Sequence, residues 1–353
     1  MRVVVTGGAG FIGSSIAVSL ATRRPDAEVV AADNLYRRGS EANLPRLHEA
    51  GVAFQHADVR HLADLDALGS FDALVECSAE PSVMASVDGR ADYLVQSNLI
   101  GAYNCLEAAA RCQAQLIFLS TSRVYPVATL SGLEIEASAT RFELAEEQSV
   151  PGASSAGIRE SLPLAGSRTL YGATKLAAEL LIEEYRAERG LRAVVNRCGV
   201  VAGPGQMGKA DQGVFAHWML SFVFGRPLSY VGYGGTGKQV RDLLHVADLV
   251  DLVEAQLADP RHWDGHTFNV GGGRTISLSL QETTAICREI TGRDLSVGSV
   301  PDVRQGDIPV YISDCSSLFS HTMWRPLRGA HEILEDLHTW IVSDASRFRG
   351  AHG

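Results

Sequence analysis

The sequence has 353 residues, enough for a large core or for one domain with a substantial appendage. Hydrophobic residues make up 46% and charged residues 20%, which is typical of a soluble globular enzyme. A net charge of −10 without any basic run argues against nucleic acid or an anionic membrane as the main partner. No apolar run is long enough to span a bilayer, and because a strand is predicted from the first residues, we expect no signal peptide. The six cysteines are scattered in no metal-binding pattern, so we expect a cytoplasmic protein with reduced thiols and no bound metal.

The first segment, residues 2–6, has the run of β-branched residues that predicts a buried parallel strand. A glycine motif follows, and then an amphipathic helix to about Arg23. Glycines let the backbone turn tightly and approach a pyrophosphate at the N-terminus of a helix. A simple turn is the alternative. The predicted pyrophosphate site comprises Gly7, Gly10, Phe11, Ile12 and Gly13.

A second strand is predicted over residues 28–32, and it ends on Asp33, twenty residues after Gly13. An acidic side chain at this position accepts hydrogen bonds from the adenosine ribose and repels a 2′-phosphate. The sequence therefore predicts NAD rather than NADP as the cofactor.

Strands and helices continue to alternate, which predicts an α/β fold with a doubly wound parallel sheet of the Rossmann type. A long helix is expected over residues 93–111. The site should lie at the carboxyl ends of the strands, where Asp58 and Val59 would meet the adenine edge. Thr121 is at such an end and could bond a substrate hydroxyl, with a Ser/Thr turn as the alternative. The further strands are expected at residues 52–56, 73–77, 115–120 and 192–197.

Tyr171 and Lys175 stand out because the chain has only three lysines among its 31 basic residues. A retained lysine indicates a place that needs a compact ammonium rather than a planar guanidinium. The two residues are four apart, so they share one face of a helix. A tyrosine must lower its pKa from ~10 by about three units to act as a base near neutrality, and an adjacent ammonium favours this. An incidental pair on a surface helix is the alternative.

The chain changes character after the sixth strand, where glycine clusters interrupt a less regular region. We expect an NAD-binding domain over residues 1–197, with 241–270 partly returning to it. A smaller substrate-binding lobe is expected over residues 198–240 and 271–353. Residues 126–168 are predicted to form a long polar connection of the kind that serves as a lid, a substrate loop or an interface arm.

Together, the three glycines, Asp33, Thr121, Tyr171 and Lys175 resemble the extended short-chain dehydrogenase/reductases that act on nucleotide sugars. Residues 240–248 and 304–307 are similar to the C-terminal signatures of that family. The resemblance implies that Thr121, Tyr171 and Lys175 form the catalytic set, with Lys175 also holding the nicotinamide ribose. It also implies a homo-oligomer, either a dimer or a tetramer.

The resemblance extends the cofactor site to Asn34, Ala79 and Asn98, and it implies a substrate site as well. Arg241 and Arg304 would grip the diphosphate of the sugar nucleotide, a bidentate task suited to guanidinium. A surface ion pair is the alternative for each arginine. The implied substrate residues are Glu80, Ser122, Arg123, Asn196, Gln212, Gly213, Lys238, Arg241 and Arg304.

Within this family the chain is most similar to the 2-epimerases of CDP-linked deoxyhexoses such as CDP-paratose and CDP-tyvelose. Residues 237–242, which include Lys238, are the most specific part of the likeness. Pro126 and Glu80 depart from the pattern. Glu80 could touch substrate, but a role in supporting the site through hydrogen bonds is favoured. Ser122 and Arg123 stand where the 4,6-dehydratases need an acid and a base, and Arg cannot serve as either.

The resemblance therefore implies a redox-neutral epimerase that removes and returns a hydride, most similar to enzymes that act at C2 of a CDP-linked deoxyhexose. A UDP-hexose 4-epimerase, or another nucleotide-sugar enzyme of the family, is the alternative. A relative that binds NAD without catalysis is a further one, although such proteins usually lose the Tyr or the Lys.

Overall fold

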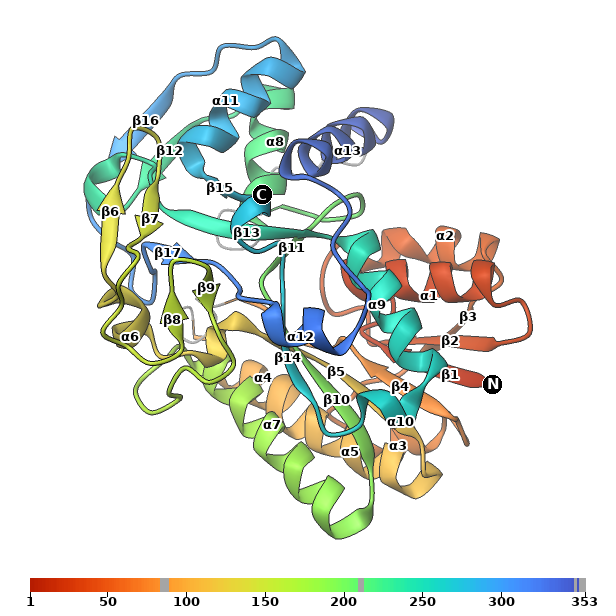
Figure 1. The fold of residues 1–353 in the computed structure, drawn as a ribbon. Helices are drawn as coiled ribbons and strands as arrows, with labels where there is room; N and C mark the ends of the chain where they lie inside the picture. Colours follow the sequence, from red (N-terminus) through yellow and green to blue (C-terminus); the bar gives the residue numbers. More distant parts are fainter. Residues whose placement is uncertain (83–88, 209–212, 346–347, 349–353) are drawn as a thin grey trace. The chain divides into compact units, whose positions relative to one another are not determined.

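The computed structural model describes residues 1–82, 89–208, 213–345 and 348, which form two compact units (Figure 1). Unit 1 contains residues 1–124, 169–198 and 250–268. Unit 2 contains residues 125–168, 199–249 and 269–353. Within the described residues, no helix is long and apolar enough to cross a membrane.

Unit 1 is built on the predicted doubly wound sheet, whose strand order is β14-β10-β5-β4-β1-β2-β3. Strands β3, β2, β1, β4, β5 and β10 pair in parallel, and the order reverses at β1, where β4 lies on the opposite side from β2. The strands are β1 (Arg2–Thr6), β2 (Glu28–Asp33), β3 (Ala53–His56), β4 (Ala73–Glu76), β5 (Gln115–Thr121), β10 (Arg192–Cys198) and β14 (Thr267–Val270). A crevice at such a reversal is the usual place for a dinucleotide.

Helices cover the sheet because its strands are apolar on both faces. Side chains of β1, β4 and β5 share one core with residues of α5 and α7, among them Leu106 and Ile182. The helical segments of unit 1 are α1 (Phe11–Arg23), η1 (Ser40–Asn43), α2 (Leu44–Glu49), α3 (Leu62–Asp66), α4 (Ala91–Val95), η2 (Gln96–Ile100), α5 (Gly101–Cys112), η3 (Ser122–Val124), α7 (Leu170–Arg189), α9 (Val246–Ala258, whose first residues belong to unit 2) and α10 (Pro260–Trp263).

The single helix predicted over residues 93–111 is divided into three segments. A π-helical turn, η2, separates α4 from α5, and Asn98 lies in this turn. A π turn inserts one extra residue per turn and re-aims the side chains around it, which is why such turns are frequent at functional sites. Hydrophobic periodicity did not reveal this change of helix type.

Unit 2 contains a small sheet in the order β11-β13-β15, with β17 also paired to β13. Helices α8, α11 and α13 enclose a second apolar core with residues such as Trp218, Cys287 and Leu337. The elements are α6 (Val127–Ser131), β6 (Ile135–Ala137), β7 (Phe142–Leu144), β8 (Ala153–Ser154), β9 (Gly157–Ile158), β11 (Val200–Ala202), α8 (Val214–Phe224), β12 (Leu228–Val231), η4 (Tyr233–Gly235), β13 (Val240–His245), η5 (Arg274–Ile276), β15 (Ser277–Ser279), α11 (Leu280–Thr291), β16 (Val297–Val300), β17 (Val310–Tyr311), α12 (Ser316–His321) and α13 (Ala330–Ser343).

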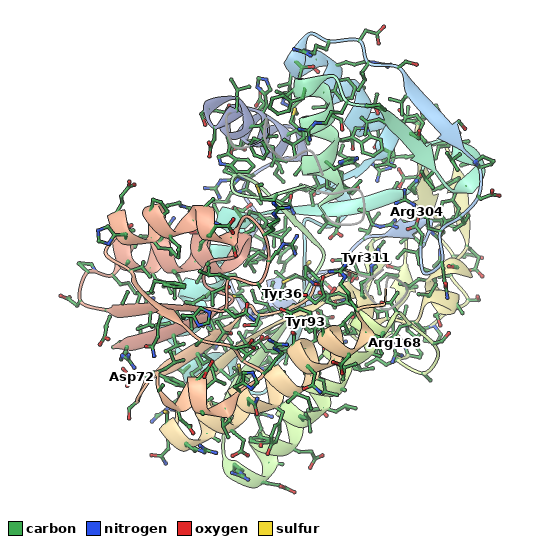
Figure 2. The ribbon with its side chains drawn as sticks, turned by 180° about the vertical axis from the view of Figure 1, so that it is seen from behind. Tyr36, Asp72, Tyr93, Arg168, Arg304 and Tyr311 are labelled. Atoms are coloured by element: carbon green, nitrogen blue, oxygen red, sulfur yellow. The ribbon has the colours of Figure 1, made fainter. Side chains whose placement is uncertain are left out.

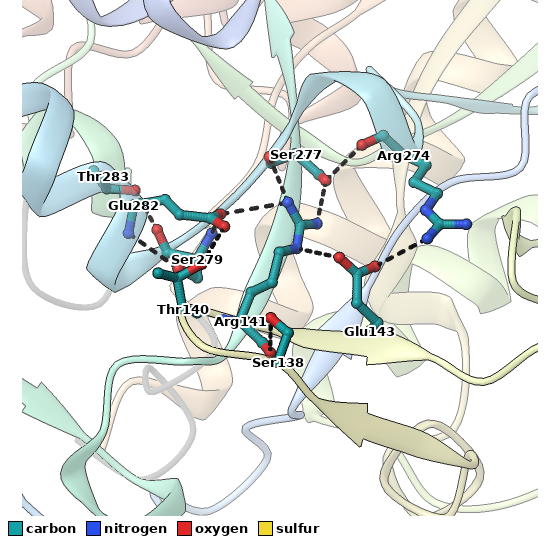
Figure 3. Close-up of polar contacts among 9 residues, drawn as sticks. All are labelled: Ser138, Thr140, Arg141, Glu143, Arg274, Ser277, Ser279, Glu282 and Thr283. Atoms are coloured by element: carbon teal, nitrogen blue, oxygen red, sulfur yellow. Dashed lines mark hydrogen bonds and ion pairs between the residues drawn. The ribbon is translucent and has the colours of Figure 1, made fainter.

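Residues 125–168 belong to unit 2, whereas the sequence analysis placed them in the first domain. They contain a short helix and two short hairpins, β6–β7 and β8–β9, whose strands of two or three residues are too short to show periodicity. Arg141 anchors the first hairpin at the N-terminus of α11 (Figure 3). Its guanidinium pairs with Glu143 and Glu282 and donates to the Ser277 hydroxyl at 2.6 Å. These contacts fix the hairpin to the second core.

Candidate active site

The loop between β1 and α1 has the shape that a pyrophosphate site requires. Gly7 adopts a φ of 63°, and a Cβ at Gly13 would lie 2.2 Å from the Gly7 carbonyl oxygen. The α1 helix begins at Phe11, and its N-cap residue Gly10 provides no side-chain cap. The first N–H groups of a helix need an acceptor, and the helix dipole favours an anionic one. This loop therefore fits the pyrophosphate of NAD, with Ile12 in the first turn.

Asp33 lies at the end of β2, where its carboxylate accepts hydrogen bonds from Ala9 N at 3.1 Å and Leu35 N at 2.8 Å. Burial raises the pKa of Asp33, and these backbone donors oppose that rise. The carboxylate is thus held beside the glycine loop, where the adenosine ribose would bind.

The adenine side is built from Asn34 and the segment after β3. Asn34 Nδ2 donates to Asp58 at 3.0 Å, and Arg60 Nη2 reaches the same carboxylate at 2.6 Å. Burial opposes ionisation of Asp58, but Arg60 and Asn34 outweigh it and lower its pKa. Val59, which follows Asp58, is almost fully buried.

Two tyrosines flank these residues. The rings of Tyr36 and Tyr93 stack with centroids 4.1 Å apart (Figure 2), and Arg60 lies over the Tyr93 ring. The sequence analysis singled out neither tyrosine, because each is isolated in the sequence and the fold alone brings them together.

Helix α7 carries Tyr171 and Lys175, and its first turn is closely fixed. Thr169 caps the helix by accepting from Gly172 N at 3.2 Å. A Cβ at Gly172 would lie 2.0 Å from the Arg123 carbonyl oxygen, so only glycine allows α7 to approach the turn after β5 this closely. That approach brings the Tyr171 phenol close enough to the Thr121 side chain for the two to interact.

The pKa of Tyr171 is raised in this structure, contrary to the lowering that catalysis requires. Burial is the largest cause of the rise, while Lys175, Thr121 and Arg123 oppose it. The described surroundings of Tyr171 thus favour a neutral phenol.

Lys175 is buried in the same region, and its Nζ lies 3.2 Å from Glu76 Oε2. The ammonium also lies 4.4 Å from the centroid of the Phe118 ring. Burial lowers the pKa of Lys175, but the Glu76 carboxylate and Tyr171 outweigh it and raise the pKa overall. The structure therefore brings Thr121, Tyr171 and Lys175 together, and it adds a carboxylate that the sequence analysis did not include.

The segment after β4 is held by the π turn. Asn98 accepts from Glu80 N at 2.8 Å and donates to Glu80 O at 3.1 Å, which fixes the backbone next to Ala79. The buried Glu80 carboxylate accepts from Ser82 N and pairs with Arg90 at 3.2 Å. Through these contacts, Glu80 and Asn98 hold the segment after β4 in place.

Asn196, which was predicted to bind substrate, lies instead in the core of unit 1. Its side chain is fully buried in β10, and its amide exchanges two hydrogen bonds of 2.9 Å with Gln256. Both ends of the amide are therefore satisfied in the core of unit 1, away from solvent. Ser122 and Arg123 lie in η3, directly after Thr121, and Arg123 N donates to the Thr121 hydroxyl at 3.2 Å.

The other predicted substrate residues belong to unit 2. Gly213 precedes α8 in a left-handed conformation, while Gln212 lies outside the described residues. Lys238 Nζ donates to Ser138 O at 2.7 Å, so it supports the β6–β7 hairpin. Arg241 pairs with Asp307 at 2.7 Å, which matches the ion-pair alternative rather than a guanidinium held open for a diphosphate. Arg304 is exposed in the segment between β16 and β17 (Figure 2).

The sequence analysis did not assign a role to three residues that shape the site. Two of them have a sequence feature that could have identified them. Glu76 is a carboxylate that ends an otherwise apolar buried strand, and such residues are rarely buried unless paired. Gly172 lies within a helix, where glycine costs about 1 kcal/mol relative to alanine and so needs a reason. Gly8 packs against β2, since a Cβ there would lie 2.7 Å from Ala31, and nothing in its local sequence distinguishes it from a turn glycine.

Comparisons with known proteins agree with this arrangement. Residues 3–271 match the NAD dependent epimerase/dehydratase family. A CDP-paratose 2-epimerase from Salmonella typhi is 28% identical, covering 97% of this chain and 100% of the relative. A dTDP-glucose 4,6-dehydratase from Mycobacterium tuberculosis is 29% identical, covering 97% of this chain and 92% of the relative.

The fold is similar to that of the UDP-glucose 4-epimerase from Thermus thermophilus, solved in complex with NAD. The TM-score is 0.76 and the identity 28%, over 100% of both chains. The family match, the glycine loop and the placement of Asp33 lead to one conclusion: the chain belongs to the NAD-dependent epimerase/dehydratase family and is an enzyme that uses NAD.

Proposed function

We propose that the protein is a nucleotide-sugar epimerase that inverts C2 of a CDP-linked deoxyhexose. The observation that carries the proposal is the cluster of Thr121, Tyr171 and Lys175 with Ser122 and Arg123 directly after the threonine. This cluster can move a proton at a sugar hydroxyl, but Ser122 and Arg123 supply no acid and base directly after the threonine for the elimination of water. The relative from Salmonella typhi is named for 2-epimerisation of a CDP-sugar, which supports the choice of carbon and base.

In this proposal the side chains manage the proton and the geometry. The Tyr171 oxygen accepts the proton of the reacting hydroxyl and later returns it. The Thr121 hydroxyl, held near both Tyr171 and Arg123 N, orients that hydroxyl. Lys175 provides a positive charge that favours the phenolate. When bound, NAD would supply the hydride acceptor in its oxidised form and the hydride donor in its reduced form. The overall reaction is therefore redox-neutral.

Arg304, an exposed residue between β16 and β17, is the candidate for binding the diphosphate. Lys238 and Arg241 would reach a substrate only by giving up the contacts described above, so we assign them to the support of unit 2. The homo-oligomer and the cytoplasmic location remain predictions.

A panel of three sugar nucleotides tests this proposal. The purified enzyme should convert CDP-paratose to its C2 epimer, identified by NMR, and should leave UDP-glucose and dTDP-glucose unchanged. Conversion of UDP-glucose to UDP-galactose, with the CDP-sugar untouched, would contradict the assignment of C2. A 4-keto-6-deoxy product from dTDP-glucose would contradict the epimerase itself and point to a dehydratase.

A further inference from the structure

We propose that Glu76 is a positioning residue that holds the Lys175 ammonium and, through it, controls when Tyr171 can accept a proton. The inference rests on the proposed function of Tyr171 and Lys175, and it assigns a role to a side chain that the reaction itself does not touch.

Glu76 is buried in direct contact with the Lys175 ammonium. It is the last residue of β4, beside Thr6 of β1, at the point where the strand order reverses. The side chains of Glu76 and Lys175 are 1% and 2% exposed, and their charged atoms are 3.2 Å apart. The Phe118 ring lies against the ammonium, so Glu76 and the ring together fix its position.

The buried ion pair of Glu76 and Lys175 is expected to add little to the stability of the fold. Removing two charges from water costs as much as their attraction returns, and well-packed apolar residues often serve equally well. The pair is also incompletely satisfied, because Glu76 Oε1 is buried with no hydrogen-bond partner among the described residues. A buried pair of this kind is better explained by its effect on neighbouring groups.

Few other described titratable groups interact with Glu76, Lys175 or Tyr171. The described titratable groups that interact with Glu76, Lys175 or Tyr171 come from four elements and the segment after β4: Arg123 of η3, Cys77 after β4, Cys105 of α5, Cys198 of β10, and Tyr171 and Lys175 themselves on α7. Burial raises the pKa of Cys77 and of Cys105 well above the usual value, so these two thiols stay neutral. The fixed charge of Arg123 does not titrate.

The direction of the effect follows from the sign of the charge. A carboxylate favours the protonated form of any group beside it, so Glu76 raises the pKa values of both Lys175 and Tyr171. In a profile of kcat/KM against pH, the acidic limb reports Tyr171 losing its proton and the alkaline limb reports Lys175 losing its charge. Glu76→Gln keeps the shape of the side chain and removes the charge. Both limbs should therefore move to lower pH, by about one pH unit each.

The experiment compares the pH profiles of the wild type, Glu76→Gln and Glu76→Asp. The Asp variant restores the charge and should return both limbs toward their wild-type positions. Glu179→Gln is the matched control, since Glu179 is a buried carboxylate on the same helix as Lys175 that pairs with Arg197 at 2.7 Å instead. This control should leave both limbs in place. Unchanged limbs in Glu76→Gln, or movement in opposite directions, would overturn the proposal.

A second readout does not depend on activity. The sequence has three lysines, so lysine labelled at the side chain gives a simple NMR spectrum, in which Lys175→Arg identifies the Lys175 signal. In the wild type, Lys175 should keep its proton to a higher pH than an ordinary lysine. Titration below that value would contradict the pairing. An inactive Tyr171→Phe variant together with unmoved limbs in Glu76→Gln would reject this inference and leave the proposed function standing.

Discussion

Replacing Tyr171 by phenylalanine is expected to lower kcat by at least ~10²-fold while leaving the fold and the bound NAD unchanged. The substitution removes one oxygen, the atom that accepts the proton of the sugar hydroxyl in the proposed reaction. The phenylalanine ring should occupy the same position as the tyrosine ring, so substrate binding should change little. Steady-state kinetics with the CDP-sugar, together with the NAD content of the denatured protein, measures both parts of this result.

Tyr185→Phe is the matched control, because Tyr185 lies on the same helix and its hydroxyl bonds Glu107 instead. It should lose about 1 kcal/mol of stability and keep its turnover. Wild-type turnover in Tyr171→Phe, or an equal loss in both variants, would contradict the assignment of Tyr171 as the proton acceptor.

Lys175→Arg is expected to lower kcat/KM by ~10²-fold or more although the positive charge is retained. The larger planar guanidinium must enter a buried site that already has Glu76 and Phe118 in contact with the ammonium. Near-wild-type kinetics in this variant would show that any cation suffices.

Lys175→Met separates the charge of Lys175 from its shape. It should lose activity to a similar degree, and it should lose about 3–5 kcal/mol of stability because Glu76 becomes an unpaired buried carboxylate. The double variant Glu76→Gln/Lys175→Met should regain much of that stability and none of the activity, as denaturant unfolding and kinetics would show. A double variant as unstable as Lys175→Met would mean that the pair is not coupled.

Much of unit 1 follows from local sequence signals. Parallel strands buried on both faces are continuous apolar runs, so β1, β2, β4, β5 and β10 lie within a residue of their predicted ends. The carboxyl ends of such strands meet at one edge, which is why Thr121 was expected at the site. The grouping of Tyr171 and Lys175 with Thr121 came from the family resemblance. The glycine loop and Asp33 were predictable because each residue type is required by backbone geometry or by charge.

Other parts depend on contacts that the local sequence does not encode. The partner of Asn196 is Gln256, sixty residues away, and the partner of Arg241 is Asp307. The hairpins within residues 125–168 are stabilised by unit 2 rather than by their own periodicity, as Arg141 shows. The raised pKa of Tyr171 reflects burial that no spacing of residues could have revealed.

Epimerisation in deuterated water tests the central claim, the removal and return of a single hydride, most directly. The enzyme is incubated with the CDP-sugar until the C2 epimers reach equilibrium, and carbon-bound deuterium is measured by NMR. The account predicts no deuterium at C2, because the hydrogen removed from C2 would return to it without exchange with water, and only the hydroxyl proton reaches Tyr171. Solvent deuterium at C2 would mean that the carbon is deprotonated as an enol, and the hydride mechanism would be wrong.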